Sequence, residues 1–169
     1  MKRILGLLLL AGMWAACQDA ATEKDEFTGN EVVFALQPGS EYNVSGTITF
    51  KERIDHTTVA LVTVSGTEGA LEHPVHLHLG DITAADADVA LLLNPVLGST
   101  GRSETTIATL ADETPVSYSD LANLNACIKI HLGASGPERD IILAGGNIGT
   151  AAANDPSGRL GSFGKCKSE

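Results

Sequence analysis

The sequence predicts an all-β sandwich or barrel, and two observations support this prediction. Short segments rich in Val, Ile, Thr and Leu recur along the chain and are separated by Gly, Pro, Asp and Asn, the pattern of short strands joined by turns. There is also no long helical period and no internal repeat. We expect strands at residues 31–36, 44–52, 57–65, 73–79, 103–110, 126–132 and 141–145.

Three further segments complete the expected organisation. A short helix is expected at residues 118–124, with Ser117 or Ser119 as its N-cap. Residues 80–101 have a loop-like composition, although 89–93 read as an additional strand. Residues 151–164 are rich in Ala, Asn, Asp, Gly and Ser, which predicts a poorly packed or extended tail.

The N-terminus has the pattern of a targeting segment. Lys2 and Arg3 precede an apolar run over residues 4–16, which is shorter than the about 20 residues that a membrane-spanning helix needs. Two alanines stand directly before Cys17, and this resembles the lipobox of bacterial lipoproteins, with Trp14 in place of the usual Leu. We therefore expect a signal peptide at residues 1–17 and a lipid anchor on Cys17 in the bacterial cell envelope; the alternative is simple secretion.

The rest of the chain is expected to be one acidic domain between two extended ends. Residues 18–30 predict a flexible acidic tether, 31–152 the β-domain and 153–169 a C-terminal tail. Removal of Lys2 and Arg3 takes the formal charge from -10 to -12. Such an acidic surface argues against nucleic acid or anionic lipid as a partner. The link to the membrane is therefore expected to be the lipid anchor on Cys17 alone.

Two cysteines remain after Cys17. Cys127 and Cys166 lack metal-binding spacing, and in an exported protein two cysteines can pair. A disulfide between them would attach the C-terminal tail to the domain, and two free thiols are the alternative.

The most functional pattern is a group of histidines on two expected strands. Residues two apart in a strand share a face, so His76 and His78 lie opposite the apolar face of Val75, Leu77 and Leu79. The same alternation turns Cys127, Lys129 and His131 outwards from the core-facing Ile128, Ile130 and Leu132. His73 shares the parity of the core face, and His56 lies in an expected turn.

Three outward imidazoles on two strands can bind one metal ion. Nitrogen ligands without a thiolate favour copper or zinc over iron–sulfur chemistry. The alternative is ordinary polar alternation on a solvent-facing strand. We expect His76, His78 and His131 as metal ligands.

The sequence resembles the copper/zinc superoxide dismutase superfamily over roughly residues 33–152. The matching segments are Val44-Ser45-Gly46-Thr47-Ile48-Thr49-Phe50, Glu68-Gly69, His73-Pro74-Val75-His76-Leu77-His78-Leu79-Gly80-Asp81, Cys127-Ile128-Lys129-Ile130-His131 and Ile142-Leu143-Ala144-Gly145-Gly146-Asn147-Ile148-Gly149. The resemblance implies a Greek-key β-barrel with copper on its outer wall. It also implies copper binding by His76, His78 and His131 and a structural role for His73.

Several features of that family are missing. No histidine occurs between Gly80 and Ser103, so the bridging histidine and the zinc-binding histidines are absent, and no zinc site is expected. Ile142 stands where the family has its superoxide-guiding arginine, and Gly145 stands where it has a disulfide cysteine. Arg139 is near in sequence, but we do not expect it to substitute because it lies in an expected turn.

A second resemblance is to the chordin-type repeat, called CHRD, a β-sandwich module. His76-Leu77-His78-Leu79-Gly80 and Asn94-Pro95-Val96 fit its pattern. Three functions therefore remain open: a copper-binding lipoprotein without full dismutase machinery, a copper-only dismutase whose fourth ligand is not located, and a non-catalytic structural or interaction module. The sequence favours the first, without an enzymatic activity.

Overall fold

The computed structural model describes residues 26–85, 87–154 and 163–164, and the strands among them form a closed barrel. The predicted signal peptide, Cys17 and Cys166 lie outside the described residues. The strands are β1 (Phe27–Pro38), β2 (Ser45–Arg53), β3 (Thr58–Ser65), β4 (Glu72–Leu79), β5 (Val89–Leu97), β6 (Arg102–Ile107), β7 (Ala126–His131) and β8 (Ile142–Ile148).

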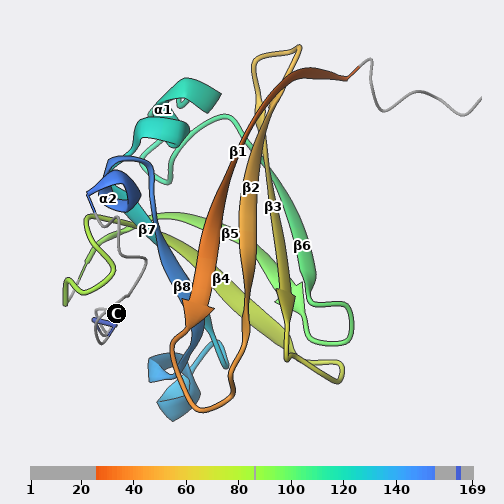
Figure 1. The fold of residues 1–169 in the computed structure, drawn as a ribbon, viewed down its shortest axis with the longest axis vertical. Helices are drawn as coiled ribbons and strands as arrows, with labels where there is room; N and C mark the ends of the chain where they lie inside the picture. Colours follow the sequence, from red (N-terminus) through yellow and green to blue (C-terminus); the bar gives the residue numbers. More distant parts are fainter. Residues whose placement is uncertain (1–25, 86, 155–162, 165–169) are drawn as a thin grey trace, which may run out of the picture.

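The strands pair antiparallel in the order β1-β2-β3-β6-β5-β4-β7-β8, and β8 closes the barrel against β1. In Figure 1, β1, β2, β3 and β6 lie side by side, while β4 and β5 cross behind them. β4, β5 and β6 follow one another directly, and β7 returns through a long connection to lie beside β4. This connectivity is a Greek key.

The predicted strands are confirmed with small shifts of their ends. β1 begins at Phe27, so the last residues of the expected tether belong to the barrel. The strand option at residues 89–93 is confirmed as β5, which continues through Pro95 to Leu97. Proline fits there because the register between β5 and β6 joins only Leu97 and Arg102, within the hairpin.

The barrel interior is a single apolar core. Strand alternation places one face of every strand inside, and side chains from both layers are fully buried there. Among the innermost are Ile48, Phe50, Leu77, Ile128 and Ile130, each with 0% exposure. This core holds β4 and β7 next to each other and so fixes the faces on which their remaining side chains lie.

One residue of the expected apolar face of β4 is on the surface. Val75 and Leu77 are buried as predicted, but Leu79 is 45% exposed. The pairing of β4 with β7 stays regular up to Leu79, which is the last residue of β4, so its side chain lies at the end of the strand and is left in solvent. The prediction that Leu79 faces the core is therefore wrong.

Short helices lie at the two ends of the barrel. The predicted helix is confirmed as α1 (Tyr118–Asn123), where Ser117 and Asp120 form a capping box. α2 (Gly149–Ala153) follows β8 at the same end (Figure 1), and the sequence did not predict it. The short 3-10 helix η2 (Gly136–Asp140) joins β7 to β8 at the opposite end. Among the described residues, no helix has the length and apolar character that crossing a bilayer requires.

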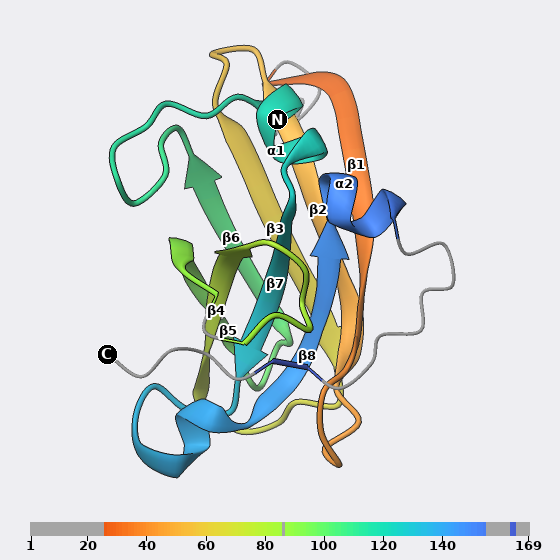
Figure 2. The same cartoon turned by 90° about the vertical axis from the view of Figure 1, so that its left-hand side faces the viewer.

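The C-terminal segment packs on the outside of the barrel. Figure 2 shows Phe163 and Gly164, in dark blue, lying across β8. A Cβ placed on Gly145 of β8 would lie 3.4 Å from the Phe163 ring, and Gly164 is buried. The expectation of a poorly packed tail is therefore wrong for Gly164 and for Ala151, which is also buried. Pairing of Cys127 with Cys166 stays a prediction.

We expect Leu77→Ala to lower the free energy of unfolding by about 2–5 kcal/mol, because it removes a fully buried side chain from the core between the two histidines of β4. Leu92→Ala on the adjacent strand is the matched control. Leu92 is 64% exposed, so its truncation should change the same quantity by less than about 0.5 kcal/mol. Urea unfolding measures both, and equal effects would contradict the placement of Leu77.

Candidate metal centre

Strands β4 and β7 bring the histidines together. The two strands pair with His76 opposite Lys129 and His78 opposite Cys127. Side chains directly opposite one another in an antiparallel pair lie on the same face, so all four lie on the outer wall. His131 is at the end of β7, where the register with β8 shifts after Ile130. The core-facing residues of both strands therefore force the imidazoles outwards.

The three predicted ligands form one cluster. His76, His78 and His131 each offer a ligand nitrogen, and these atoms all lie within 4.8 Å of one another. The ring centroid of His76 is 4.6 Å from that of His131 and 5.7 Å from that of His78. Nitrogens bound to one copper or zinc ion at about 2.0–2.1 Å are roughly 3–4 Å apart. Small rotations of the side chains would therefore bring all three onto one ion.

Two of the histidines are oriented by backbone carbonyls. Nδ1 of His78 lies 2.9 Å from the carbonyl oxygen of Ala87, and Nδ1 of His131 lies 2.6 Å from that of Arg139. A carbonyl only accepts, so each Nδ1 carries the proton and donates it. Nε2 of each ring is then the nitrogen with a lone pair for a metal, an arrangement common around metal-binding histidines.

The third histidine has an unusual nitrogen. Nδ1 of His76 is buried and has no hydrogen-bond partner among the described residues. Leaving a buried polar atom unpaired costs about 1–3 kcal/mol, and such an atom in a native structure needs an explanation. A metal ion bound to this nitrogen supplies one. The donor set and the orphaned atom thus both fit a metal.

The surroundings keep the histidines in the form that binds metals. Burial lowers the pKa of His76 from 6.5 to about 4, and the neighbouring charges of His131, His78 and Arg139 act in the same direction. Burial likewise lowers the pKa of His131 to about 4 and lowers that of His78, against the raising effect of their carbonyl partners. Because only neutral imidazole is a ligand, no proton has to leave before a metal binds at neutral pH.

The other two histidines lie outside the cluster, as the sequence predicted. His73 is buried, and its Nδ1 lies 3.0 Å from the carbonyl oxygen of Leu132, so it ties the start of β4 to the end of β7. His56 is exposed in the turn after β2 with a φ of 68°. Asp81, just after β4, also has its own partners: it accepts a hydrogen bond from the Asn147 side chain at 2.6 Å and two from Thr83.

Two cationic residues are closer to the cluster than the sequence suggested. Lys129 was expected to face outwards, and it does lie on the outer wall, but it is 0% exposed. Arg139 lies in η2, whose backbone contacts His131, and its charge lowers the pKa of His76 and His131. Strand alternation predicts from the sequence that Lys129 lies on the outer wall. No local pattern indicates that it is buried, or that Arg139 lies near the histidine cluster.

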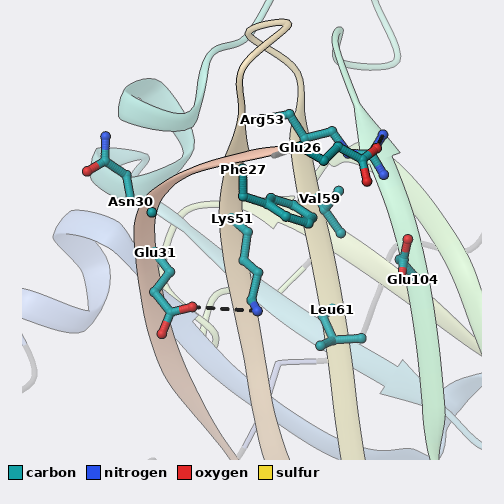
Figure 3. Close-up of a pocket in the computed structure, with 10 residues that line it drawn as sticks. Glu26, Phe27, Asn30, Glu31, Lys51, Arg53, Val59, Leu61 and Glu104 are labelled. Atoms are coloured by element: carbon teal, nitrogen blue, oxygen red, sulfur yellow. Dashed lines mark ion pairs between the residues drawn. The ribbon is translucent and has the colours of Figure 1, made fainter. Parts of the chain in front are cut away.

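An open depression of about 540 Å³ lies elsewhere, on the outer wall of the layer formed by β1, β2, β3 and β6 (Figure 3). Its cations are paired, Lys51 with Glu31 at 3.6 Å and Arg53 with Glu26. Both cations also lie over the ring of Phe27. Because these charges offset one another, the histidine cluster is the stronger candidate for a functional site.

Comparisons of this chain with protein-family models, with curated proteins and with solved structures found no match. The geometry of the histidine cluster is therefore the basis on which a function can be assigned.

We expect the metal-free protein to lose stability as the pH falls below about 6.5. The unfolded chain binds protons at its histidines below their ordinary pKa of 6.5, whereas His76 and His131 stay neutral in the folded barrel down to about 4. The unfolded state therefore binds more protons in this window, and stability that is present above it is lost. Each extra proton bound by the unfolded chain lowers the free energy of unfolding by about 1.4 kcal/mol for each unit by which the pH falls.

Urea unfolding with a chelator present, between about pH 8 and about pH 5, measures this dependence while the carboxyl groups stay largely ionised. The variant His76→Gln should have a shallower dependence, because it lacks one of the protons. A free energy of unfolding that is constant over this range would show that the imidazoles are not held neutral.

Proposed function

We propose that this protein is a copper-binding lipoprotein of the bacterial cell envelope, with His76, His78 and His131 as its copper ligands. The observation that carries the proposal is the convergence of three nitrogens within 4.8 Å, together with the unpaired Nδ1 of His76. The described residues would act by holding three neutral imidazoles in place, two of them fixed by backbone carbonyls.

The chemistry of the ligands favours copper over other metals. Imidazole suits copper, zinc and nickel, and copper heads the affinity order for divalent first-row ions. The resemblance to the copper/zinc superoxide dismutase superfamily points to the same metal, and the Greek-key barrel is consistent with it. Bound copper supplies one-electron exchange between Cu(II) and Cu(I), and three protein ligands leave a position open.

The envelope location depends on the N-terminal sequence. Lys2, Arg3, the apolar run and Cys17 fit a lipoprotein signal, and the acidic residues after Cys17 fit a solvated tether. The partner is then a membrane, reached through the lipid, and nucleic acid is not a partner because the chain is strongly acidic.

Copper titration followed by electron paramagnetic resonance tests the proposal. The wild type should bind Cu(II) more tightly than about 1 µM, with a spectrum showing nitrogen ligands. The variant His78→Ala should bind at least about 100-fold more weakly, because losing a ligand costs more than losing an outer partner of one. Its matched control is His56→Asn, since His56 is exposed and Asn tolerates its positive φ.

Identical spectra for the wild type and His78→Ala, or wild-type binding weaker than micromolar, would overturn the copper proposal. The histidines would then be remnants in a CHRD-like structural or interaction module. Loss of binding in His56→Asn would show that the copper lies outside the cluster.

A second candidate function is a copper-only superoxide dismutase. The observation in its favour is Arg139, whose positive charge lowers the pKa of His76 and His131 and could attract an anion to the cluster. Against it, the cluster among the described residues contains three ligands and no bridging histidine.

We expect the copper-loaded protein to consume superoxide no faster than free aqueous copper, because it lacks the bridging histidine that delivers protons in the family it resembles. Stopped-flow measurement of superoxide decay checks this. A rate well above that of free copper, lost in Arg139→Gln with copper still bound, would establish the dismutase instead.

A further inference from the structure

A fully buried lysine lies beside the histidine cluster. Lys129 pairs directly with His76 across β4 and β7 and stands two positions before His131 on the same face of β7. Its exposure is 0%. Lysine is almost never fully buried unless it is paired, because removing an ammonium group from water is costly. Its position therefore calls for a specific role.

The C-terminal segment fixes the ammonium group. Nζ of Lys129 donates a hydrogen bond to the carbonyl oxygen of Gly164 at 2.6 Å. Gly164 is itself held by a hydrogen bond from its N–H to the carbonyl oxygen of Ile82 at 3.0 Å. A Cβ on Gly164 would lie 2.2 Å from the carbonyl oxygen of Ala84, so the segment fits closely against the loop after β4.

Strand β8, next to Lys129, has a glycine where a side chain would obstruct the C-terminal segment. Lys129 pairs with Gly145 of β8, and the Phe163 ring passes over the surface that a side chain at position 145 would fill. Figure 2 shows the backbone of residues 163–164 crossing β8 on the outside of the barrel. The lysine is thus covered by protein instead of water, and its charge is poorly screened.

The carbonyl that pairs with Lys129 is a neutral group. It satisfies one donor of the ammonium, yet it does not neutralise the positive charge, which stays on the outer wall that also carries the histidines. A fixed positive charge on the strand pair that carries these imidazoles repels any cation bound to them.

We propose that Lys129 sets the charge preference of the metal centre, favouring the monovalent ion Cu(I) over divalent ions such as Cu(II) and Zn(II). This inference rests on the proposed copper site. The physical reason is that a fixed positive charge repels a doubly charged ion twice as strongly as a singly charged one at the same position. Lys129 acts through space and is not itself a ligand.

Two variants separate the charge of Lys129 from its hydrogen bond. Lys129→Gln removes the charge and keeps an N–H donor for Gly164, whereas Lys129→Met removes both. Lys51→Gln is the matched control, because it removes one positive charge from the opposite layer, where Lys51 pairs with Glu31. The dissociation constants for Cu(I), measured anaerobically by chelator competition, and for Cu(II) are determined for each full-length protein.

Both Lys129 variants should shift the ratio of the Cu(I) to Cu(II) affinities towards Cu(II) by about tenfold, the size expected for one nearby charge. For a one-electron couple, a tenfold shift lowers the reduction potential by about 59 mV. Zn(II) binding should also tighten, and Lys51→Gln should leave the ratio unchanged.

The outcomes distinguish this inference from the proposed function. Copper binding with a ratio unchanged in Lys129→Gln overturns the role of Lys129 and leaves the copper site standing. A shift in Lys129→Met alone also overturns it, since the hydrogen bond would then be responsible. No copper binding by the wild type or by any variant overturns both.

Discussion

The site depends on one constraint, the packing of alternate residues of β4 and β7 into the barrel core. Val75 and Leu77 on β4 and Ile128 and Ile130 on β7 are essentially buried, and the register joins Val75 to Ile130 and Leu77 to Ile128. A shift of either strand by one residue would turn the whole apolar set outwards. The hydrophobic effect that stabilises the barrel therefore also fixes which side chains meet on its outer wall.

Local periodicity explains which parts of the fold the sequence could predict. Alternation of apolar residues identified β2, β3, β4 and β7, and the capping box of α1 is visible as Ser117 followed by Asp120. Leu79 was misplaced because alternation gives the face of a residue but does not show that this residue, the last of β4, is left in solvent. β5 was left uncertain because residues 80–101 have the Asp, Asn, Pro and Gly content of a loop. Only the pairing pattern shows that β6 takes no ladder hydrogen bond from position 95, where proline has no N–H to donate.

The candidate site divides in the same way. The convergence of His76, His78 and His131 follows from parity on two strands, so the sequence could predict it. The burial of Lys129 could not be predicted, because it depends on a contact with Gly164, which is distant in the chain. No pattern near Lys129 indicates that the C-terminal segment packs over it. The same holds for the carbonyl partners of His78 and His131, which come from loops whose paths alternation does not determine.

These contacts give the three histidines unequal roles. His78 and His131 are fully buried and held at Nδ1 by carbonyls, so their rings are positioned before any metal arrives. His76 is only partly buried, its Nδ1 has no partner among the described residues, and it pairs with the exposed Leu92 of β5. A metal ion approaching the outer wall would therefore meet a fixed pair of nitrogens and one ring able to adjust. Such a centre combines preorganisation with an accessible side, and the access lies at His76.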